Sequence, residues 1–238
     1  MISVVTICRN ERRKIQSTID SVKEQSCTEF EWIVIDGNST DGTVEILKSD
    51  QERMSTFISE SDTGIYNAMN KGLIHAKGEY VLFLNGGDTF AGPESLEILR
   101  KNAGPDVLYG DLAVQDRPGE VIRYPASITS DFFKTRTLPH QATAVKRSLM
   151  LQYGGFDESY QIAGDYEFFA RLFQKPDRTS SHLNSVISEF GSDGISNSAR
   201  YRRLRKRENH RLRWNHVPSY RGTFKCWRHI LKRCVGLA

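Results

Sequence analysis

The 238-residue sequence has no apolar run long enough to cross a membrane. A membrane-spanning helix needs about 20 consecutive apolar residues, and the longest candidate, residues 80–84, has the length of a strand. Residues 1–7 lack the basic segment and the cleavage site of a signal peptide. We therefore interpret them as a first strand and expect a cytoplasmic protein.

Cysteines and the common nucleotide-binding motifs are also scarce. The four cysteines, Cys8, Cys27, Cys226 and Cys234, show neither zinc-ligand nor C-x-x-C spacing, which indicates free thiols in a reducing compartment. The sequence contains no Walker A motif and no G-x-G-x-x-G motif. Standard P-loop and dinucleotide-binding sites therefore have no support.

Most of the chain carries a net negative charge, and the positive charge is concentrated at its end. Residues 1–199 contain 20 Lys and Arg against 28 Asp and Glu, whereas residues 200–238 contain 13 against 1. A mildly acidic body with a strongly basic tail indicates a polyanionic partner, either a membrane surface or a nucleic acid.

The first 110 residues alternate between strand and helix patterns. We predict strands at residues 3–7, 30–35, 57–59 and 80–84. We predict helices after a capping Asn10, at Thr43–Ser49, and around the apolar face of Ile65, Met69 and Leu73. This alternation favours an α/β fold with a Rossmann-like, mainly parallel sheet flanked by helices. In the less regular second half, residues 107–109 and 186–190 have strand character and residues 165–173 have helix character.

Acidic residues follow the predicted strands. Parallel strands place their carboxyl ends along one edge of a sheet, where ligands bind. Asp also favours turns and helix caps, which is the structural alternative, but the convergence of the whole set favours a functional edge. The acids concerned are Asp36, Glu60, Asp62, Asp88 and Asp111.

Two carboxylates have the sequence context of a sugar-transfer site. Asp88 ends the run Asn85-Gly86-Gly87-Asp88, where an oxygen ligand suits Mg²⁺ or Mn²⁺ and the glycines admit a diphosphate. Asp165 begins a predicted helix and is our candidate for the base that deprotonates an acceptor hydroxyl. The alternative for each is a role as a cap or turn residue. Glu167 lies on a different side of the helix from Asp165.

Several motifs together resemble one family. They lie at residues 4–11 (VVTICRNE), 33–43 (IVIDGNSTDGT), 59–72 (SESDTGIYNAMNKG), 155–158 (GFDE) and 164–167 (GDYE). Over residues 1 to about 200, the sequence is similar to family 2 glycosyltransferases of the GT-A fold. It most resembles a subgroup that builds bacterial surface polysaccharides such as colanic acid.

The resemblance implies roles for individual residues. Thr6 and Glu11 would border the nucleotide, Asp36 would bind the base, and Asp62 would lie near the base or ribose. Asp88 would hold the metal, and Asp165 would be the catalytic base. His140, Gln141 and the loop at residues 191–196 would face the donor diphosphate or the acceptor.

The sequence departs from the family pattern at two places. Where the family often has D-x-D, only Asp88 remains, which puts the strength of metal binding in doubt. Where it commonly has Glu-Asp, Gly164 precedes Asp165, so the base is kept but an acceptor contact is missing.

The domain organisation follows from these patterns. We assign residues 1–110 to a nucleotide-sugar-binding half, 111–199 to an acceptor-binding half of the same domain, and 200–238 to a basic helical tail. Near the end, Phe224, Trp227, Leu231 and Cys234 are spaced as one apolar helix face among basic residues, a pattern typical of helices that lie on anionic membranes. A helix packed on the body or on a dimer partner is the alternative.

These expectations combine into one hypothesis. The chain is predicted to be an inverting glycosyltransferase at the inner membrane face, moving a sugar from a nucleotide-sugar donor, expected to be UDP-linked, to a lipid-linked saccharide in bacterial surface polysaccharide synthesis. Three alternatives remain open: transfer to polyprenyl phosphate, a non-enzymatic nucleic-acid-binding protein, and a degenerate family member that binds nucleotide without turnover.

Overall fold

The computed structural model describes residues 1–175, 177–191, 194 and 198–223. Nine strands in this part of the chain form one sheet with the order β3-β2-β1-β4-β8-β6-β9-β5, and β7 pairs with β6 outside that path. The strands are β1 Ile2–Cys8, β2 Phe30–Asp36, β3 Thr56–Ser59, β4 Tyr80–Phe83, β5 Thr89–Phe90, β6 Val107–Val114, β7 Val121–Ile122, β8 Thr143–Lys146 and β9 Ser180–Phe190.

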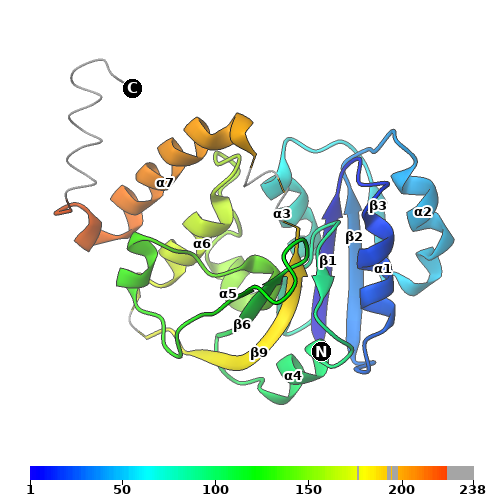
Figure 1. Cartoon of the computed structure of the whole chain (residues 1–238), viewed down its shortest axis with the longest axis horizontal. Helices are drawn as coiled ribbons and strands as arrows, with labels where there is room; N and C mark the ends of the chain where they lie inside the picture. The colour runs from blue at the N-terminus through cyan, green and yellow to red at the C-terminus, as the bar shows by residue number, and fades with distance from the viewer. Residues whose placement is uncertain (176, 192–193, 195–197, 224–238) are drawn as a thin grey trace.

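The predicted parallel sheet is confined to the first four strands. β1 is central and pairs in parallel with β2 and β4, and β2 pairs in parallel with β3. β8 then pairs antiparallel with both β4 and β6, and only β6 and β9 pair in parallel in this second half. The carboxyl ends of the first four strands therefore lie along one edge, at the top of Figure 1.

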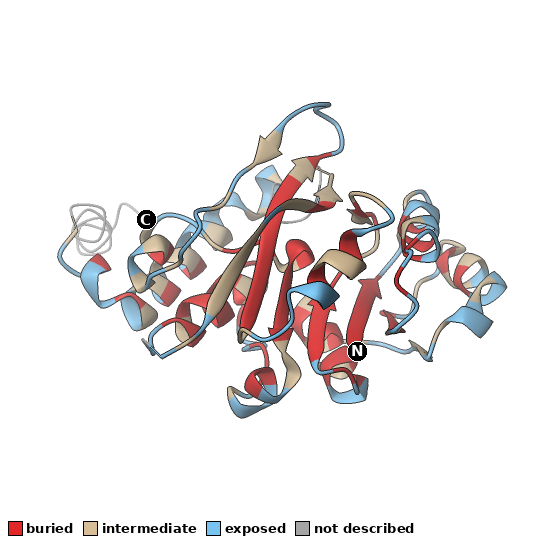
Figure 2. Ribbon diagram, turned by 90° about the horizontal axis from the view of Figure 1, so that it is seen from below, coloured by how far each residue is buried: buried red, intermediate tan, exposed pale blue. Residues whose placement is uncertain are grey.

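Helices cover both faces of the sheet. They are α1 Ile15–Lys23, α2 Thr43–Ser49, α3 Ile65–His75, α4 Ser95–Lys101, α5 Arg147–Gln152, α6 Gly164–Leu172 and α7 Arg202–His216. One apolar core lies between the sheet and α1, α2 and α4. The other lies between the sheet and α3, α5, α6 and α7. The strands β1, β2, β4 and β6 are almost entirely buried (Figure 2), as expected for strands covered on both faces.

The predicted helix start at Asn10 is wrong. α1 begins at Ile15, and no side chain caps it. Asn10 instead adopts a left-handed backbone conformation with φ of 56°, and its side-chain oxygen accepts a hydrogen bond from the backbone N–H of Thr40, with an N···O distance of 2.9 Å. Asn tolerates this conformation better than most residues, so Asn10 stabilises the loop after β1 and does not cap a helix.

The basic helix α7 is packed on the body of the protein. It lies along α6 in Figure 1, and Leu212 is fully buried in the core that α6 contributes to. The 3-10 turn that follows, Pro218–Tyr220, buries Tyr220 in the same core. Residues 202–220 therefore belong to the folded domain, whereas the amphipathic pattern predicted from Phe224 to Cys234 lies outside the described residues.

A buried carboxylate holds α7 in place. Glu208 accepts hydrogen bonds from the backbone N–H groups of Gln161, Ile162 and Ala163, at 2.8, 3.0 and 2.9 Å from its carboxylate oxygens. Unsatisfied buried N–H groups are costly, so this contact fixes both partners. Glu208 thereby positions the segment that leads directly into α6. None of the helices in the described ranges combines the length and the apolar character needed to span a membrane.

Candidate functional site

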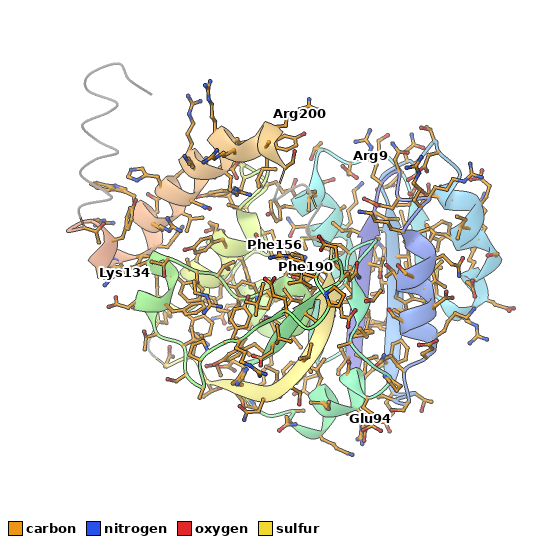
Figure 3. All side chains as sticks on the ribbon, in the orientation of Figure 1. Arg9, Glu94, Lys134, Phe156, Phe190 and Arg200 are labelled. Atoms are coloured by element: carbon orange, nitrogen blue, oxygen red, sulfur yellow. The ribbon has the colours of Figure 1, made fainter. Side chains whose placement is uncertain are left out.

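A cleft of about 470 Å³ lies at the edge where β1 and β4 end. Its walls come from the ends of those strands, from the start of α3 and from the segment before α6. Arg9 and Arg200 mark the two sides of this edge in Figure 3. The polar side chains of the lining include Arg9, Asp62, Tyr66, Asn85, Glu158 and Tyr201.

Two of the predicted nucleotide contacts do not reach this cleft. Thr6 is completely buried, and its hydroxyl accepts a hydrogen bond from Trp32 Nε1 at 3.0 Å. Asp36 is also completely buried, and its carboxylate accepts hydrogen bonds from the side chains of Ser39 and Ser59 and from the backbone N–H of Ser39. Both therefore support the sheet edge from within, and their predicted contacts with the nucleotide stay predictions.

Asp62, by contrast, lines the cleft. Its Oδ1 accepts a hydrogen bond from the backbone N–H of Gly64 at 2.9 Å. Its Oδ2 lies so close to Gly37 that a side chain there would collide with it. The glycine in the motif at residues 33–43 therefore provides the space into which this carboxylate fits.

The same motif ties two loops together at the edge of the cleft. Asp41 accepts hydrogen bonds from the backbone N–H groups of Arg12 and Thr43, both at 3.0 Å. The Thr43 hydroxyl in turn accepts the backbone N–H of Glu11 at 2.9 Å. The motif thus fixes the loop after β1, from which Arg9 projects, before any ligand is present.

Asp88 is a carboxylate whose side chain makes no hydrogen bond within the described ranges. Burial and the neighbouring charge of Glu11 raise its pKa to about 7, against the opposing charges of His140 and Lys14. Outside the masked segments, no group of three His, Cys, Asp or Glu side chains could hold a metal alone. Asp88 therefore fits Mg²⁺ or Mn²⁺ only where a bound diphosphate and water supply further oxygens.

Asp165 occupies the centre of a hydrogen-bonded chain. The Tyr66 hydroxyl donates to its Oδ1 at 3.2 Å. His140 Nδ1 lies 3.2 Å from its Oδ2, and His140 Nε2 lies 3.0 Å from Asn85 Nδ2. Asp165 makes no capping hydrogen bond to α6, so the structural alternative considered for it is not what holds it here.

His140 stands between the two carboxylates that the sequence singled out. Burial lowers the pKa of its imidazole, but the hydrogen bond and charge of Asp165, together with the charge of Asp88, raise this pKa above its ordinary value overall. A protonated imidazole donates from both nitrogens. Asn85 Oδ1 is buried without a hydrogen-bond partner, so an exchange of the amide oxygen and nitrogen would give this oxygen the donor at Nε2.

Gly164 is explained by the ring of Tyr66. A Cβ at position 164 would lie 2.7 Å from Cε2 of that ring, closer than packed atoms approach. The departure from the family's Glu-Asp pattern therefore accompanies a tyrosine that occupies the space and donates to Asp165. Burial and the charge of Asp165 raise the pKa of Tyr66, which keeps its hydroxyl protonated as a donor.

The remaining residues singled out from the sequence lie in different surroundings, and not all of them are near the cleft. Glu11 lies near Asp88, close enough to influence its pKa. Gln141 is buried, and its carbonyl accepts a hydrogen bond from Ser188. Most of the loop at residues 191–196 lies outside the described residues. Glu60 and Asp111 are ion-paired away from the cleft, with Lys71 at 2.6 Å and Arg123 at 3.0 Å, so the strand-end acids do not all converge.

Several cleft residues were not predicted from the sequence as site residues. Tyr66 and Asn67 lie in a quoted motif but received no role, and Arg9 lies in another. Glu158 accepts hydrogen bonds from Asn67 and Asn70, at 3.0 and 2.9 Å. It therefore ties α3 to the segment before α6. The polar spacing at residues 66, 67 and 70 was the available signal, because it places three polar side chains on the first turns of one helix.

Comparison with known proteins identifies the family. The model of "Glycosyl transferase family 2" matches residues 3–150. The chain belongs to this family. This glycosyltransferase is 33% identical over 203 residues to an uncharacterized glycosyltransferase of Mycobacterium tuberculosis, covering 82% of this chain and 76% of that protein. It is 28% identical over 210 residues to a PGL/p-HBAD biosynthesis glycosyltransferase of the same species, covering 83% and 80%.

Solved structures share the fold of this glycosyltransferase. Staphylococcus aureus TarS, residues 1–349, superimposes with a TM-score of 0.70 and 21% identity, covering 89% of this chain and 63% of that one. The mannosyltransferase PcManGT from Pyrobaculum calidifontis gives a TM-score of 0.62 and 21% identity, covering 87% and 61%. The chain thus spans less than two thirds of either structure. The predicted GT-A fold and the predicted enzyme class are confirmed, and the non-enzymatic nucleic-acid-binding alternative is wrong.

The close contact between Gly164 and Tyr66 generates a prediction. Gly164→Ala should lower the free energy of unfolding by about 1–3 kcal/mol, because the added methyl group overpacks against the ring. The same substitution made in a Tyr66→Ala background should cost much less, since the ring is gone. Urea unfolding of the four proteins in this cycle gives the coupling; equal costs in the two backgrounds would show that the contact is not what excludes a side chain.

Proposed function

We propose that this glycosyltransferase inverts the configuration of a sugar that it transfers from a nucleotide-sugar donor, with Asp165 as the base. The observation that carries the proposal is the placement of Asp165. Its carboxylate is held by Tyr66 and His140, and Tyr66 itself lines the cleft. A carboxylate fixed beside a cleft in this way is ready to accept a proton from a hydroxyl.

The cleft at the strand ends is the proposed donor site. Asp62 can accept hydrogen bonds from ribose or base, and Arg9 offers a cation at the rim. We favour a UDP-linked donor. TarS has been solved with UDP-GlcNAc and with UDP, whereas PcManGT has been solved with GDP-Man and Mn²⁺, so the nucleotide is a point for measurement. The volume of about 470 Å³ is in the range of cofactor-sized pockets.

Asp88 is the proposed ligand of Mg²⁺ or Mn²⁺ in the donor complex. The ion would supply positive charge that stabilises the departing nucleoside diphosphate. The chain contributes a single carboxylate whose pKa of about 7 reflects its burial. Binding of the ion and of the diphosphate should therefore depend on each other.

In the transfer step one bond to the sugar forms, one bond breaks and one proton moves. The acceptor oxygen bonds to the anomeric carbon while the bond from that carbon to the diphosphate oxygen breaks. The hydroxyl proton passes to a carboxylate oxygen of Asp165. Inversion requires attack from the side opposite the leaving group, so Asp165 and Asp88 must act on opposite sides of the sugar. His140 lies between them: it contacts Asp165, and the charges of both carboxylates raise its pKa.

The acceptor is proposed to be a lipid-linked saccharide in polysaccharide synthesis, reached from the inner face of a membrane. Support comes from the basic, amphipathic sequence of residues 224–234. Transfer directly to polyprenyl phosphate remains the alternative acceptor reaction. It differs in the group that receives the sugar, a phosphate rather than a sugar hydroxyl.

Replacing the proposed base should separate binding from chemistry. Asp165→Asn keeps the hydrogen bond from Tyr66 but accepts a proton poorly, so transfer should fall at least 10³-fold, the order expected when a general base is lost. UDP affinity measured by calorimetry should stay near that of the wild type. Turnover at the wild-type rate would exclude Asp165 as the base.

Replacing the proposed metal ligand should remove a pH dependence. At pH 6 the free Asp88 is mostly protonated and at pH 8 mostly ionised, because its pKa is about 7. Mn²⁺ binds only the ionised form, so the affinity for UDP with Mn²⁺ should rise about tenfold between these pH values. Asp88→Asn should bind more weakly and show only the titration of UDP itself. Equal profiles for both proteins would remove Asp88 from the metal site.

The proposed membrane contact is tested by truncation after Thr223. The cut keeps Tyr220, which is buried in the core, and removes the amphipathic sequence. Sedimentation with vesicles of anionic lipid should pellet the full chain, and the truncated chain should stay in the supernatant. An Asp165→Asn variant of full length serves as the matched control and should pellet. Pelleting of the truncated chain to the same extent would rule out residues 224–238 as the contact.

A further inference from the structure

A second pocket neighbours the cleft, because Ile162 lines both, and Asp165 lines this second one. It measures about 390 Å³ and is formed by residues 122–137, by the start of α6 and by one face of α7. Asp165 lines it, together with Arg136, Arg205 and Arg213. Arg205 and Arg213 lie beyond the family match, which ends at residue 150, and none of the three arginines belongs to the sequence motifs.

The three guanidinium groups carry positive charge that no carboxylate neutralises within the described ranges. Arg136 stacks on the ring of Tyr124, 4.9 Å from its centroid, and Nη2 donates to the carbonyl of Arg123 at 3.0 Å. Arg213 Nε donates to the hydroxyl of Tyr166 at 3.0 Å. Over the same ranges, Arg205 makes neither a hydrogen bond nor an ion pair. Asp165 is the single acidic residue of the lining.

The arginines of α7 are arranged by the helix itself. Arg205, Asn209 and Arg213 are spaced four residues apart and therefore lie on one face, and all three line the pocket. Glu208 fixes that face by accepting three backbone N–H groups from the segment before α6. The backbone positions of these residues are thus set before a ligand arrives, which lowers the cost of binding. The helix α7, which is part of the basic tail inferred from the sequence, therefore forms one wall of the second pocket.

We propose that this second pocket binds a phosphate group of the acceptor. The inference rests on the proposed role of Asp165, because it places the acceptor's anionic group next to the base. Planar guanidinium groups pair with phosphate through two parallel hydrogen bonds, and three of them around one pocket can bind one phosphate or two adjacent ones. The phosphate of a lipid-linked sugar and the phosphodiester of a polymer share this chemistry.

The arrangement also keeps two anionic groups apart. The donor diphosphate belongs near Asp88 and Asn85, on the cleft side of His140, whereas the acceptor phosphate lies beyond Asp165. A hydroxyl near that phosphate then faces the carboxylate from the second pocket. The sugar to be transferred lies between them, as inversion requires.

Calorimetry with two probes tests the proposal and distinguishes a lipid-linked phosphate from the phosphodiester of a polymer. Geranyl diphosphate represents a lipid-linked diphosphate, and a short glycerol phosphate oligomer represents a polymer. Each is titrated into the full-length protein in the presence of saturating UDP and Mg²⁺, so that the donor cleft is filled. We expect one probe to bind the wild type, and the probe that binds names the source. Geraniol, which lacks the phosphate, should not bind.

Matched variants assign the binding to the pocket. Arg205→Gln with Arg213→Gln should weaken the probe at least tenfold. Arg203→Gln with Arg207→Gln removes the same charge from the exposed, opposite face of α7 and should bind like the wild type. If the first pair fails to fold, as judged by circular dichroism, Arg136→Gln replaces it, because that side chain is exposed.

Two outcomes overturn the proposal. One is that neither probe binds the wild type. The other is that loss of affinity is equal in the two arginine pairs, which would show a non-specific charge effect. Failure of the proposed function gives a different result: UDP binding is lost, or Asp165→Asn transfers normally, while the probe titrations are unaffected.

Discussion

The carboxylate of Asp165 joins parts of the chain that are far apart in sequence. Tyr66 reaches it from α3, and His140 reaches it from the turn before β8. Each contact depends on a wider support, since α3 packs against β1 and β2 and Asn85, at the end of β4, holds the far side of His140. The geometry of this group is therefore set by both halves of the sheet, and the position of the proposed base follows from the fold.

The first half of the fold was readable from the sequence because its signals are local. Continuous apolar strands and periodic helices at residues 30–35, 43–49 and 65–73 predict the observed elements within about two residues. In the second half, the patterns at residues 107–109, 165–173 and 186–190 mark parts of β6, α6 and β9. The strand pairing there was not readable, because β6, β8 and β9 pair across long sequence separations and with mixed direction. The two short helices α4 and α5 lack the length that makes a periodic pattern visible.

The site was partly readable for a related reason. Residue type and spacing pointed to Asp62, Asp88 and Asp165, and the family resemblance pointed to His140. The structure places these four residues at the cleft or around the chain of contacts beside it. The same reasoning could not distinguish Asp36 from Asp62, because both are acids that follow strands. What separates them is burial: Asp36 is enclosed by two serines, and Asp62 faces the cleft. Tyr66 was not predicted as a site residue because its partner, Asp165, lies 99 positions away in the sequence.

The anchoring of α7 by Glu208 has a consequence for how the enzyme is made. The segment that leads into α6 keeps three backbone N–H groups unsatisfied until Glu208 arrives. During synthesis, the motif-bearing part of the chain leaves the ribosome long before this residue does. A chain that ends before Glu208 therefore lacks the partner that holds the segment before α6, and with it the fixed position of the proposed base. The last described helix thus joins the integrity of the end of the chain to the geometry around Asp165.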